Sequence, residues 1–258
     1  MEKPLILVTN DDGITAPGLR ALIGCMKEIG EVVVVAPDSP QSGMGHAITV
    51  DSTLFVKKVV IDSIHGAPHE YSSSGTPADC VKLALRELLD RSPDLCVSGI
   101  NHGANSSINV LYSGTMSAAL EAGIEGIPAI GFSLCDFSWE ADFGPALPFV
   151  KIIVEQALLH KIPEGTVLNV NIPKVERPKG IKICRQARGN WKESFDKRVS
   201  PSGKDYFWLS GHYELLDKGK DTDEWALEQG YVSIVPTQFD LTAYQAMSHI
   251  NNWNLNGQ

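Results

Sequence analysis

Residues 4–37, "PLILVTNDDGITAPGLRALIGCMKEIGEVVVVAP", contain two apolar runs on either side of a segment with apolar side chains at helical spacing. The runs "PLILVT" and "EVVVVAP" have the continuous apolar character of buried strands, and "GLRALIGCMKEIG" predicts a helix between them. A strand, a helix and a second strand with short connections form a right-handed βαβ unit. The stretch therefore predicts a parallel sheet that is buried on both faces.

The alternation of strands and helices continues to about residue 159. Thr76 stands at the N-cap of a predicted helix, with Pro77 at its first position and Asp79 in its first turn. Further strands are predicted at "DLCVSGIN", "PAIGFS" and "LNVNIP", and further helices at "GTMSAALEAG" and "LPFVKIIVEQALL". We expect an α/β fold with a doubly wound, mostly parallel, Rossmann-like sheet, whose core and site occupy residues 1–180.

Residues 181–258 differ in composition from this core. The stretch 182–208 is polar and predicts an extended β-hairpin arm, and "YVSIVPTQFDLTAYQAMSHI" predicts a strand followed by a terminal helix. An isolated two-stranded hairpin is marginally stable in water, so the arm needs a partner surface. We expect this segment, continuous with the core domain, to assemble a homodimer or homotetramer.

Charge and composition exclude several classes of partner and compartment. The net charge of -9 argues against a nucleic acid polymer or an anionic membrane, because both are bound through an excess of Lys and Arg. The five cysteines lack CxxC spacing and resemble buried thiols rather than disulfides or a zinc site. No basic, apolar leader is apparent and no apolar run approaches the ~20 residues of a membrane span, so we expect a cytoplasmic protein.

Two adjacent carboxylates, Asp11 and Asp12, follow the first predicted strand directly. The carboxyl ends of strands in open parallel sheets are where ligands bind. A single Asp in a loop is commonly a turn former or a helix cap, but only one of a pair can cap the helix. The two charges repel each other by roughly a kcal/mol or more at close range, unless a cation relieves them.

Other strand ends offer further oxygen donors. The loop "APDSPQSGMGHAIT" supplies Ser42 and His46, and "SGINHGAN" supplies Asn101, His102 and Asn105. Two carboxylates, a hydroxyl and a carboxamide suit Mg²⁺, Mn²⁺ or Ca²⁺ rather than zinc. Taken alone, each of these residues fits ordinary turn chemistry.

The segment "YSGTMSAALEAG" opens a predicted helix with Ser113, Gly114 and Thr115. Backbone N–H groups, hydroxyls and the positive end of the helix dipole favour an anion at such a terminus. An ordinary N-cap explains Ser113 or Thr115 equally well, but not their clustering beside a cation site. The sequence predicts a phosphate-binding helix terminus in an acidic protein.

Five ordered motifs together resemble the SurE, or stationary-phase survival protein, family of metal-dependent 5′-nucleotidases: "ILVTNDDGI", "VVAPDSPQSGMGHAIT", "GTPADCV", "VSGINHGAN" and "YSGTMSAALEA". The resemblance implies that one divalent cation per subunit is held by Asp11, Asp12, Ser42 and Asn101. It implies that phosphate is held by Asn105, Ser113, Gly114 and Thr115, and that dimers or tetramers assemble through an arm and an exchanged C-terminal element.

The resemblance implies hydrolysis of nucleoside 5′-monophosphates, with 3′-nucleotides and short polyphosphate as further candidates. We expect Asp11 or Asp12 to act as base, with Asn10 orienting. His46 and His102 are candidates to contact the substrate and protonate the leaving oxygen, although simple loop hydrogen bonding explains each of them as well.

Two alternatives use similar residues. A haloacid dehalogenase type phosphatase also begins with an Asp after its first strand, but requires Asp-x-Asp-x-Thr, whereas this chain has Asn10, Asp11 and Asp12 followed by a glycine. A receiver-type signalling module needs a phosphoacceptor Asp at a later strand end, where this chain has Asn101.

Overall fold

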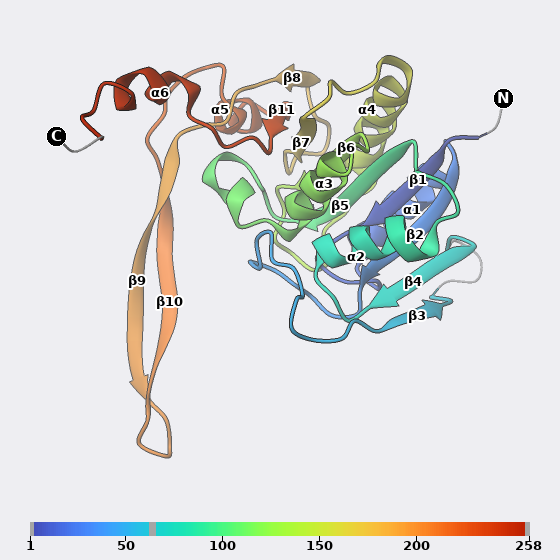
Figure 1. The fold of residues 1–258 in the computed structure, drawn as a ribbon, viewed down its shortest axis with the longest axis horizontal. Coiled ribbons are helices and arrows are strands. Elements are labelled where there is room, and N and C mark those ends of the chain that lie inside the picture. The colour runs from blue at the N-terminus through green and yellow to red at the C-terminus, as the bar shows by residue number, and fades with distance from the viewer. Residues whose placement is uncertain (1–2, 62–65, 256–258) are drawn as a thin grey trace.

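The computed structural model describes residues 3–61 and 66–255. One nine-stranded sheet forms its centre, with the strand order β3-β4-β2-β1-β5-β6-β7-β11-β8, and β9 and β10 form a separate hairpin (Figure 1). The strands are β1 (Leu5–Thr9), β2 (Glu31–Pro37), β3 (Val56–Val59), β4 (His69–Ser73), β5 (Leu95–His102), β6 (Ala129–Leu134), β7 (Thr166–Ile172), β8 (Ile181–Ile183), β9 (Gly189–Val199), β10 (Asp205–Leu215) and β11 (Val232–Gln238).

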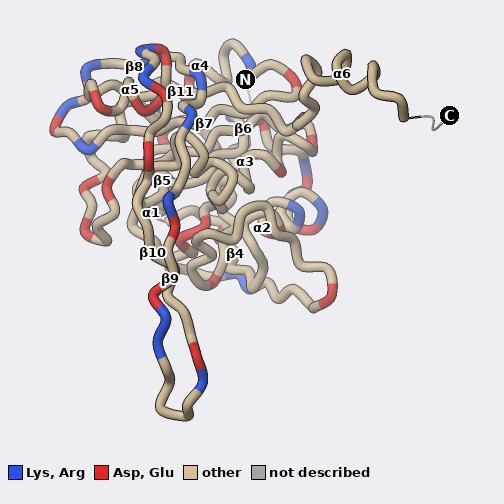
Figure 2. Tube along the Cα trace, turned by 90° about the vertical axis from the view of Figure 1, so that its left-hand side faces the viewer, with Lys and Arg blue, Asp and Glu red and all other residues tan. Residues whose placement is uncertain are grey.

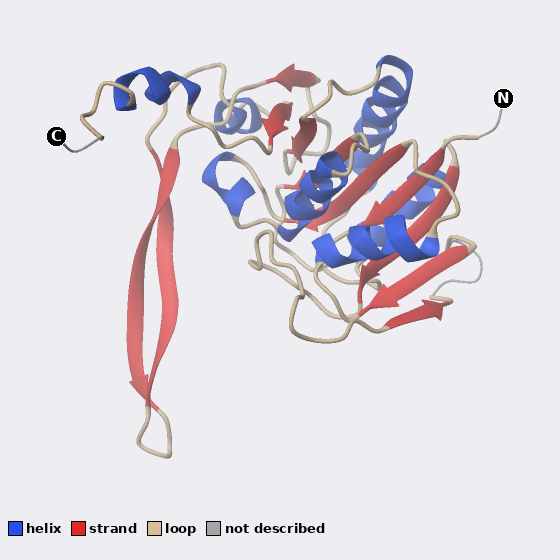
Figure 3. Cartoon of the chain, viewed as in Figure 1, coloured by secondary structure: helices blue, strands red, loops and turns tan. Residues whose placement is uncertain are grey.

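Helices cover both faces of the sheet (Figure 3). One core layer joins α1 and α4 to the sheet through residues such as Leu22 and Val154, and the other joins α2 and α3 through residues such as Val81 and Met116. The helical elements are α1 (Pro17–Lys27), α2 (Pro77–Leu83), η1 (Ala84–Leu88), η2 (Ser107–Leu111), α3 (Gly114–Ile124), η3 (Gly144–Ala146), α4 (Leu147–His160), α5 (Asp223–Glu228) and α6 (Tyr244–Ile250). Burial on both faces explains why the central strands are continuously apolar.

The winding of the sheet reverses beside β1. This strand pairs in parallel with both β2 and β5. From β1 the chain builds outward through β2 and β4, and it then returns to build the other half through β5, β6 and β7. The predicted doubly wound α/β fold is therefore confirmed, and the crevice where ligands bind in such sheets lies at the carboxyl ends of β1 and β5.

Local signals were accurate where the chain is buried. Thr76 and Asp79 form the predicted N-terminal cap of α2, because each side chain accepts a hydrogen bond from the other residue's backbone N–H. The edge strand β3 and its neighbour β4, which also pairs with β2, were missed. β3 is the polar stretch "VKKV", which pairs antiparallel with β4 at the margin of the sheet. An edge strand is half exposed and needs no apolar run.

The hairpin of β9 and β10 projects away from the body of the molecule (Figure 1). Its register runs from Gly189 opposite Leu215 to Val199 opposite Asp205. The observed arm therefore begins and ends later than the predicted 182–208, since residues 181–183 form β8 and pair with β11 in the main sheet. Figure 2 shows basic and acidic residues interspersed along both strands of the arm.

Two further expectations concern the cysteines and the membrane. All five cysteines are free thiols, and Cys135 alone is half-buried while the other four are buried. Across the described ranges, the structure contains no helix that is long and apolar enough to cross a membrane.

Candidate functional site

Three polar residues follow β1 and are largely withdrawn from solvent. Asn10 is 1% exposed and Asp11 is 4% exposed. The Asn10 Nδ2 donates to the carbonyl oxygen of Gly13 at 3.0 Å, which fixes the turn into α1. Its Oδ1 is buried and has no hydrogen-bond partner in the described part of the chain. A buried carboxamide oxygen without a donor is costly, and this one is available to a cation or a water molecule.

The N-terminus of α3 packs directly against Asp11. The Thr115 Oγ1 donates to Asp11 Oδ1 at 2.5 Å. Gly114 permits this approach, because a Cβ at that position would lie 2.6 Å from the Cβ of Asp11. Ser113 caps the helix, its hydroxyl accepting from the N–H of Met116 at 3.0 Å. The first carboxylate and the predicted phosphate-binding terminus are therefore one contiguous site.

The side chain of Asp11 has a raised pKa. Burial, together with the neighbouring charge of Asp12, raises the pKa of Asp11 from 3.8 to about 6, and hydrogen bonds from Thr115 oppose the rise. A carboxylate with this environment gains strongly from a bound cation, because the cation removes both sources of the penalty.

Asp12 faces the end of β5. Its Oδ2 lies 3.2 Å from Nδ1 of His102 and accepts from the backbone N–H of that residue at 3.3 Å. The imidazole stacks on Trp139 at a centroid distance of 5.3 Å and meets Phe143 edge-on at 5.0 Å. Its Nε2 is buried without a partner among the described residues. Since an ionised carboxylate only accepts, the contact with Asp12 places the imidazole proton on Nδ1.

A bulge in β5 directs Asn101 and His102 toward this edge. The pairing of β5 with β6 shifts register between Ser98 and Asn101. Gly99 makes the shift possible, with a φ of +130° and no room for a Cβ, which would lie 2.3 Å from the carbonyl oxygen of Phe132. Bulges commonly re-aim side chains beside active sites. The Asn101 Nδ2 then donates to the carbonyl oxygen of Gly103 at 2.9 Å.

The loop after β2 reaches the site through its backbone. The N–H of Gln41 donates to the carbonyl oxygen of Asp11 at 2.7 Å. Ser42 is the next residue and its side chain is exposed. The loop is therefore tied to the first carboxylate, with a hydroxyl one residue beyond the tie.

His46, in the same loop, contacts a different part of α3. Its Nε2 lies 2.8 Å from Oε2 of Glu121, whose other oxygen accepts from Lys82 at 2.5 Å. Hydrogen bonds from His46 and Lys82 lower the pKa of Glu121. Glu121 lies seven residues beyond Gly114, which corresponds to roughly 10 Å along the helix axis. His46 therefore contacts α3 about two helical turns beyond its N-terminus.

Asn105 belongs to a buried network of amides. Its Nδ2 donates to Ser133 Oγ at 2.8 Å, and its backbone N–H donates to Asn171 Oδ1 at 2.7 Å. Asn169 completes the network by donating to the carbonyl oxygen of Asn105 at 2.9 Å. These contacts anchor the loop that follows β5 to the ends of β6 and β7.

Sequence reasoning missed two supports of the site. Trp139 and Phe143, which hold His102, lie in a connection without periodic pattern. Asp223 is fully buried, and its carboxylate accepts from the N–H groups of Ser107 and Ala187, both at 2.8 Å. The sequence contains an N-cap residue, Thr222, at the start of α5. It contains no signal for the contact between Asp223 and Ser107 of η2.

The residues present fit a hard divalent cation. Two carboxylates, the unpartnered oxygen of Asn10 and the neighbouring hydroxyl and carboxamide form an oxygen-rich donor set. In residues 3–61 and 66–255, no group of three or more His, Cys, Asp and Glu side chains is placed to hold a metal ion. The predicted set contains only two such side chains, so it relies on Ser42 and Asn101 for its other ligands.

Comparison with known proteins identifies the family. A family model described as "Survival protein SurE" matches residues 6–193. The chain belongs to the SurE family. A Flavobacterium psychrophilum protein named 5′-nucleotidase SurE is 64% identical to this SurE-family chain over 258 residues, covering 99% of this chain and 100% of that protein.

Two further relatives agree. A Flavobacterium johnsoniae protein of the same name is 65% identical over 258 residues, covering 99% of each. The crystal structure of the SurE protein from Aquifex aeolicus matches with a TM-score of 0.82 and 42% sequence identity, covering 96% of this chain and 98% of that one.

Proposed function

We propose that this SurE-family chain is a 5′-nucleotidase that hydrolyses nucleoside 5′-monophosphates to nucleoside and phosphate. The observation that supports the proposal is the contact between Asp11 and the N-terminus of α3, because a helix N-terminus beside a carboxylate pair at the reversal of the sheet can attract a phosphate and its cation together. Relatives named 5′-nucleotidase over nearly their full length favour this activity over an aspartyl-phosphate phosphatase or a signalling module.

We infer that Asp11, Asp12, Ser42 and Asn101 hold one divalent cation per subunit, Mg²⁺ or Mn²⁺. A bound cation of this kind supplies charge neutralisation for the phosphate oxygens and lowers the pKa of nearby water. The high pKa of Asp11 and the unpartnered Asn10 oxygen support the assignment.

The protein residues bind, orient and move protons. Gly114 and Thr115, with the helix dipole, attract the phosphate, and Ser113 fixes the start of the helix. Asp12 is the better placed base, because its side chain is 12% exposed while Asp11 is more deeply buried. His102 holds Oδ2 of Asp12, which leaves Oδ1 to take the proton of the attacking water. Asn10 orients that water through its free oxygen.

The leaving ribose oxygen needs a proton. His102 Nε2 is the candidate with a free position, whereas His46 is engaged by Glu121. Because the contact with Asp12 keeps a proton on Nδ1, Nε2 can donate a proton only when the imidazole is doubly protonated, and the donation leaves the neutral Nδ1–H form. Asn105 supports the loop that carries this edge of the site. We propose 3′-nucleotides and short polyphosphate as secondary substrates, since the site recognises the phosphate through groups that contact no other part of the substrate.

Phosphate release tests the proposal. Nucleoside 5′- and 3′-monophosphates and polyphosphate are incubated with Mg²⁺, Mn²⁺ or excess chelator, and released phosphate is measured. We expect cation-dependent hydrolysis that is highest for 5′-monophosphates and is abolished by Asp12→Asn. Activity that survives exhaustive chelation undiminished would exclude the metal assignment, and absence of phosphate release from every substrate would exclude the enzyme.

A further inference from the structure

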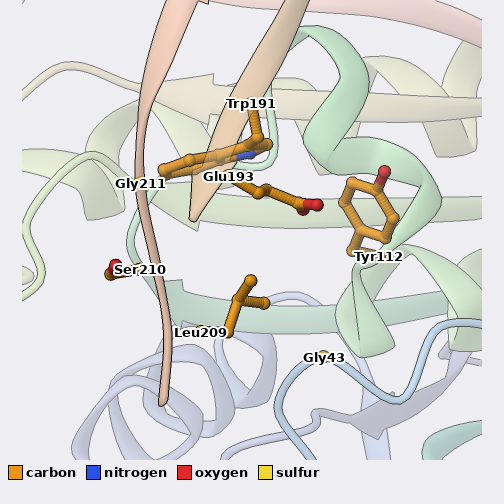
Figure 4. A pocket seen from close by; sticks show the side chains of 7 residues that line it. All are labelled: Gly43, Tyr112, Trp191, Glu193, Leu209, Ser210 and Gly211. Atoms are coloured by element: carbon orange, nitrogen blue, oxygen red, sulfur yellow. The ribbon is translucent and has the colours of Figure 1, made fainter. Parts of the chain in front are cut away.

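A cavity of about 540 Å³ lies between the arm and the core (Figure 4). Gly43 and Tyr112 line it from the core, and Trp191, Glu193 and Leu209 line it from the hairpin. Figure 4 shows the Glu193 carboxylate pointing toward the Tyr112 ring, with Trp191 above Glu193 and Leu209 below it. This cavity has no role in the chemistry described above.

The cavity adjoins the candidate site through both of its core residues. Gly43 follows Ser42, and Tyr112 directly precedes Ser113, the cap of α3. The N–H of Gly45 donates to the carbonyl oxygen of Tyr112 at 3.3 Å, which joins these two walls. The cavity therefore begins one residue from Ser42 and one residue from the cap of α3, next to the predicted phosphate position.

Trp191 forms a fixed aromatic wall. Its Nε1 donates to Asn109 Oδ1 at 2.8 Å, and its ring meets Tyr213 edge-to-face at 6.0 Å. Trp191 is nevertheless 39% exposed, and Leu209 is 60% exposed. Aromatic side chains held with an open face are the surfaces on which nucleobases stack.

Glu193 gives the cavity a polar selector. In the described part of the chain, its carboxylate has no ion-pair or hydrogen-bond partner. The cations nearest to it along the hairpin are engaged elsewhere, Lys192 with Glu214 at 3.2 Å and Lys197 with Asp205 at 2.6 Å. An ionised carboxylate only accepts hydrogen bonds, so it selects a ligand that presents N–H donors.

We propose that the cavity binds the nucleobase of the substrate, stacked on Trp191, and that Glu193 selects guanine and rejects uracil. This assignment rests on the proposed function. Guanine presents two adjacent donors, N1–H and N2–H, which match the two oxygens of a carboxylate. Adenine and cytosine present one amino donor each. Uracil presents one N–H between two carbonyl oxygens, which repel the carboxylate.

The test compares kcat/KM for guanosine and uridine 5′-monophosphates with that for ribose 5-phosphate, which has the same leaving oxygen and no nucleobase. Glu193→Gln lowers kcat/KM for guanosine 5′-monophosphate about tenfold or more, which is the range for losing hydrogen bonds to a charged group. The uridine value does not fall, because an amide pairs with the N–H and one carbonyl of uracil. Trp191→Ala lowers kcat/KM for both nucleotides by roughly 5- to 100-fold, and Trp191→Phe restores most of that loss.

Control variants and a binding readout separate the possible outcomes. Glu176→Gln, on an exposed loop after β7, and Trp208→Ala, in the hairpin, change the same residue types away from the cavity. Ribose 5-phosphate reports the phosphate chemistry alone. If all phosphate release is absent, the proposed function fails, and quenching of tryptophan fluorescence by guanosine still tests the cavity. Equal losses for guanosine and uridine nucleotides in Glu193→Gln, or no loss, overturn the selector. A loss that disappears with 2′-deoxyguanosine monophosphate assigns the carboxylate to the ribose and overturns the base assignment.

Discussion

Replacing Asp11 by Asn should stabilise the metal-free protein. Burial, with the charge of Asp12, raises the pKa of Asp11 from 3.8 to about 6. At about 1.4 kcal/mol for each unit of pKa, the ionised carboxylate costs the folded state about 3 kcal/mol. Asn keeps an oxygen for the Thr115 hydroxyl but adds an N–H₂ group that needs an acceptor. The expected net gain at pH 7.5 is about 1–2 kcal/mol, or roughly 2–8 °C in melting temperature.

The sign of the effect depends on pH. The pKa of Asp11 is raised in the folded state, so the cost of ionising it in the folded protein depends on pH. This cost is absent below about pH 4, grows between about pH 4 and pH 6, and is fully present above about pH 6. The advantage of Asp11→Asn should therefore be present at pH 7.5 and absent at pH 4.5. Adding Mg²⁺ or Mn²⁺ at about 100 times the dissociation constant should raise wild-type stability by about 2.7 kcal/mol and leave the variant nearly unchanged.

Thermal melts in chelator and in metal, at both pH values, measure these differences. Asp79→Asn is the matched control. Burial opposes ionisation of Asp79, but hydrogen bonds from Thr49 and Thr76 outweigh it and lower the pKa of its carboxylate, so that variant should be less stable at pH 7.5. An Asp11→Asn protein that melts below the wild type at pH 7.5 in chelator, or by the same margin at both pH values, would refute the reasoning.

Three further predictions address the chemistry and the arm. No covalent phosphoenzyme should accumulate during turnover. The measurement is an acid quench with labelled substrate followed by peptide mapping, and phosphate found on Asp11 or Asp12 would contradict the prediction. Gly114→Ala should reduce kcat/KM at least tenfold without unfolding the protein, because its Cβ would lie 2.6 Å from that of Asp11; full activity would show that the helix need not approach so closely. We propose that the arm and α6 assemble a homodimer or homotetramer. Replacing residues 195–209 by a two-residue Asn-Gly turn should then lower the mass measured by light scattering. An unchanged mass, or a monomeric full-length protein, would count against this proposal.

The strand ends of the candidate site could be predicted from sequence because parallel sheets impose their geometry. Once residues 4–37 predict a βαβ unit, the carboxylates after β1 must lie at the edge where the other strands also end. Contacts between residues close together in the chain were also predictable, because their spacing alone brings them together. The cap formed by Thr76 and Asp79 at the start of α2 is an example. Such patterns depend only on local backbone geometry and on the alternation of buried segments.

The sequence by itself therefore determined the doubly wound core, the acidic pair after its first strand and the capped N-terminus of α3. Only the tertiary structure decided the partners of the two histidines. His102 meets Asp12 across 90 residues, and His46 meets Glu121 across 75. It alone also decided that the arm returns Trp191 and Glu193 to the side of Tyr112. These contacts join elements far apart in the chain, so they follow from how helices, loops and hairpin pack together and have no periodic signal in the sequence.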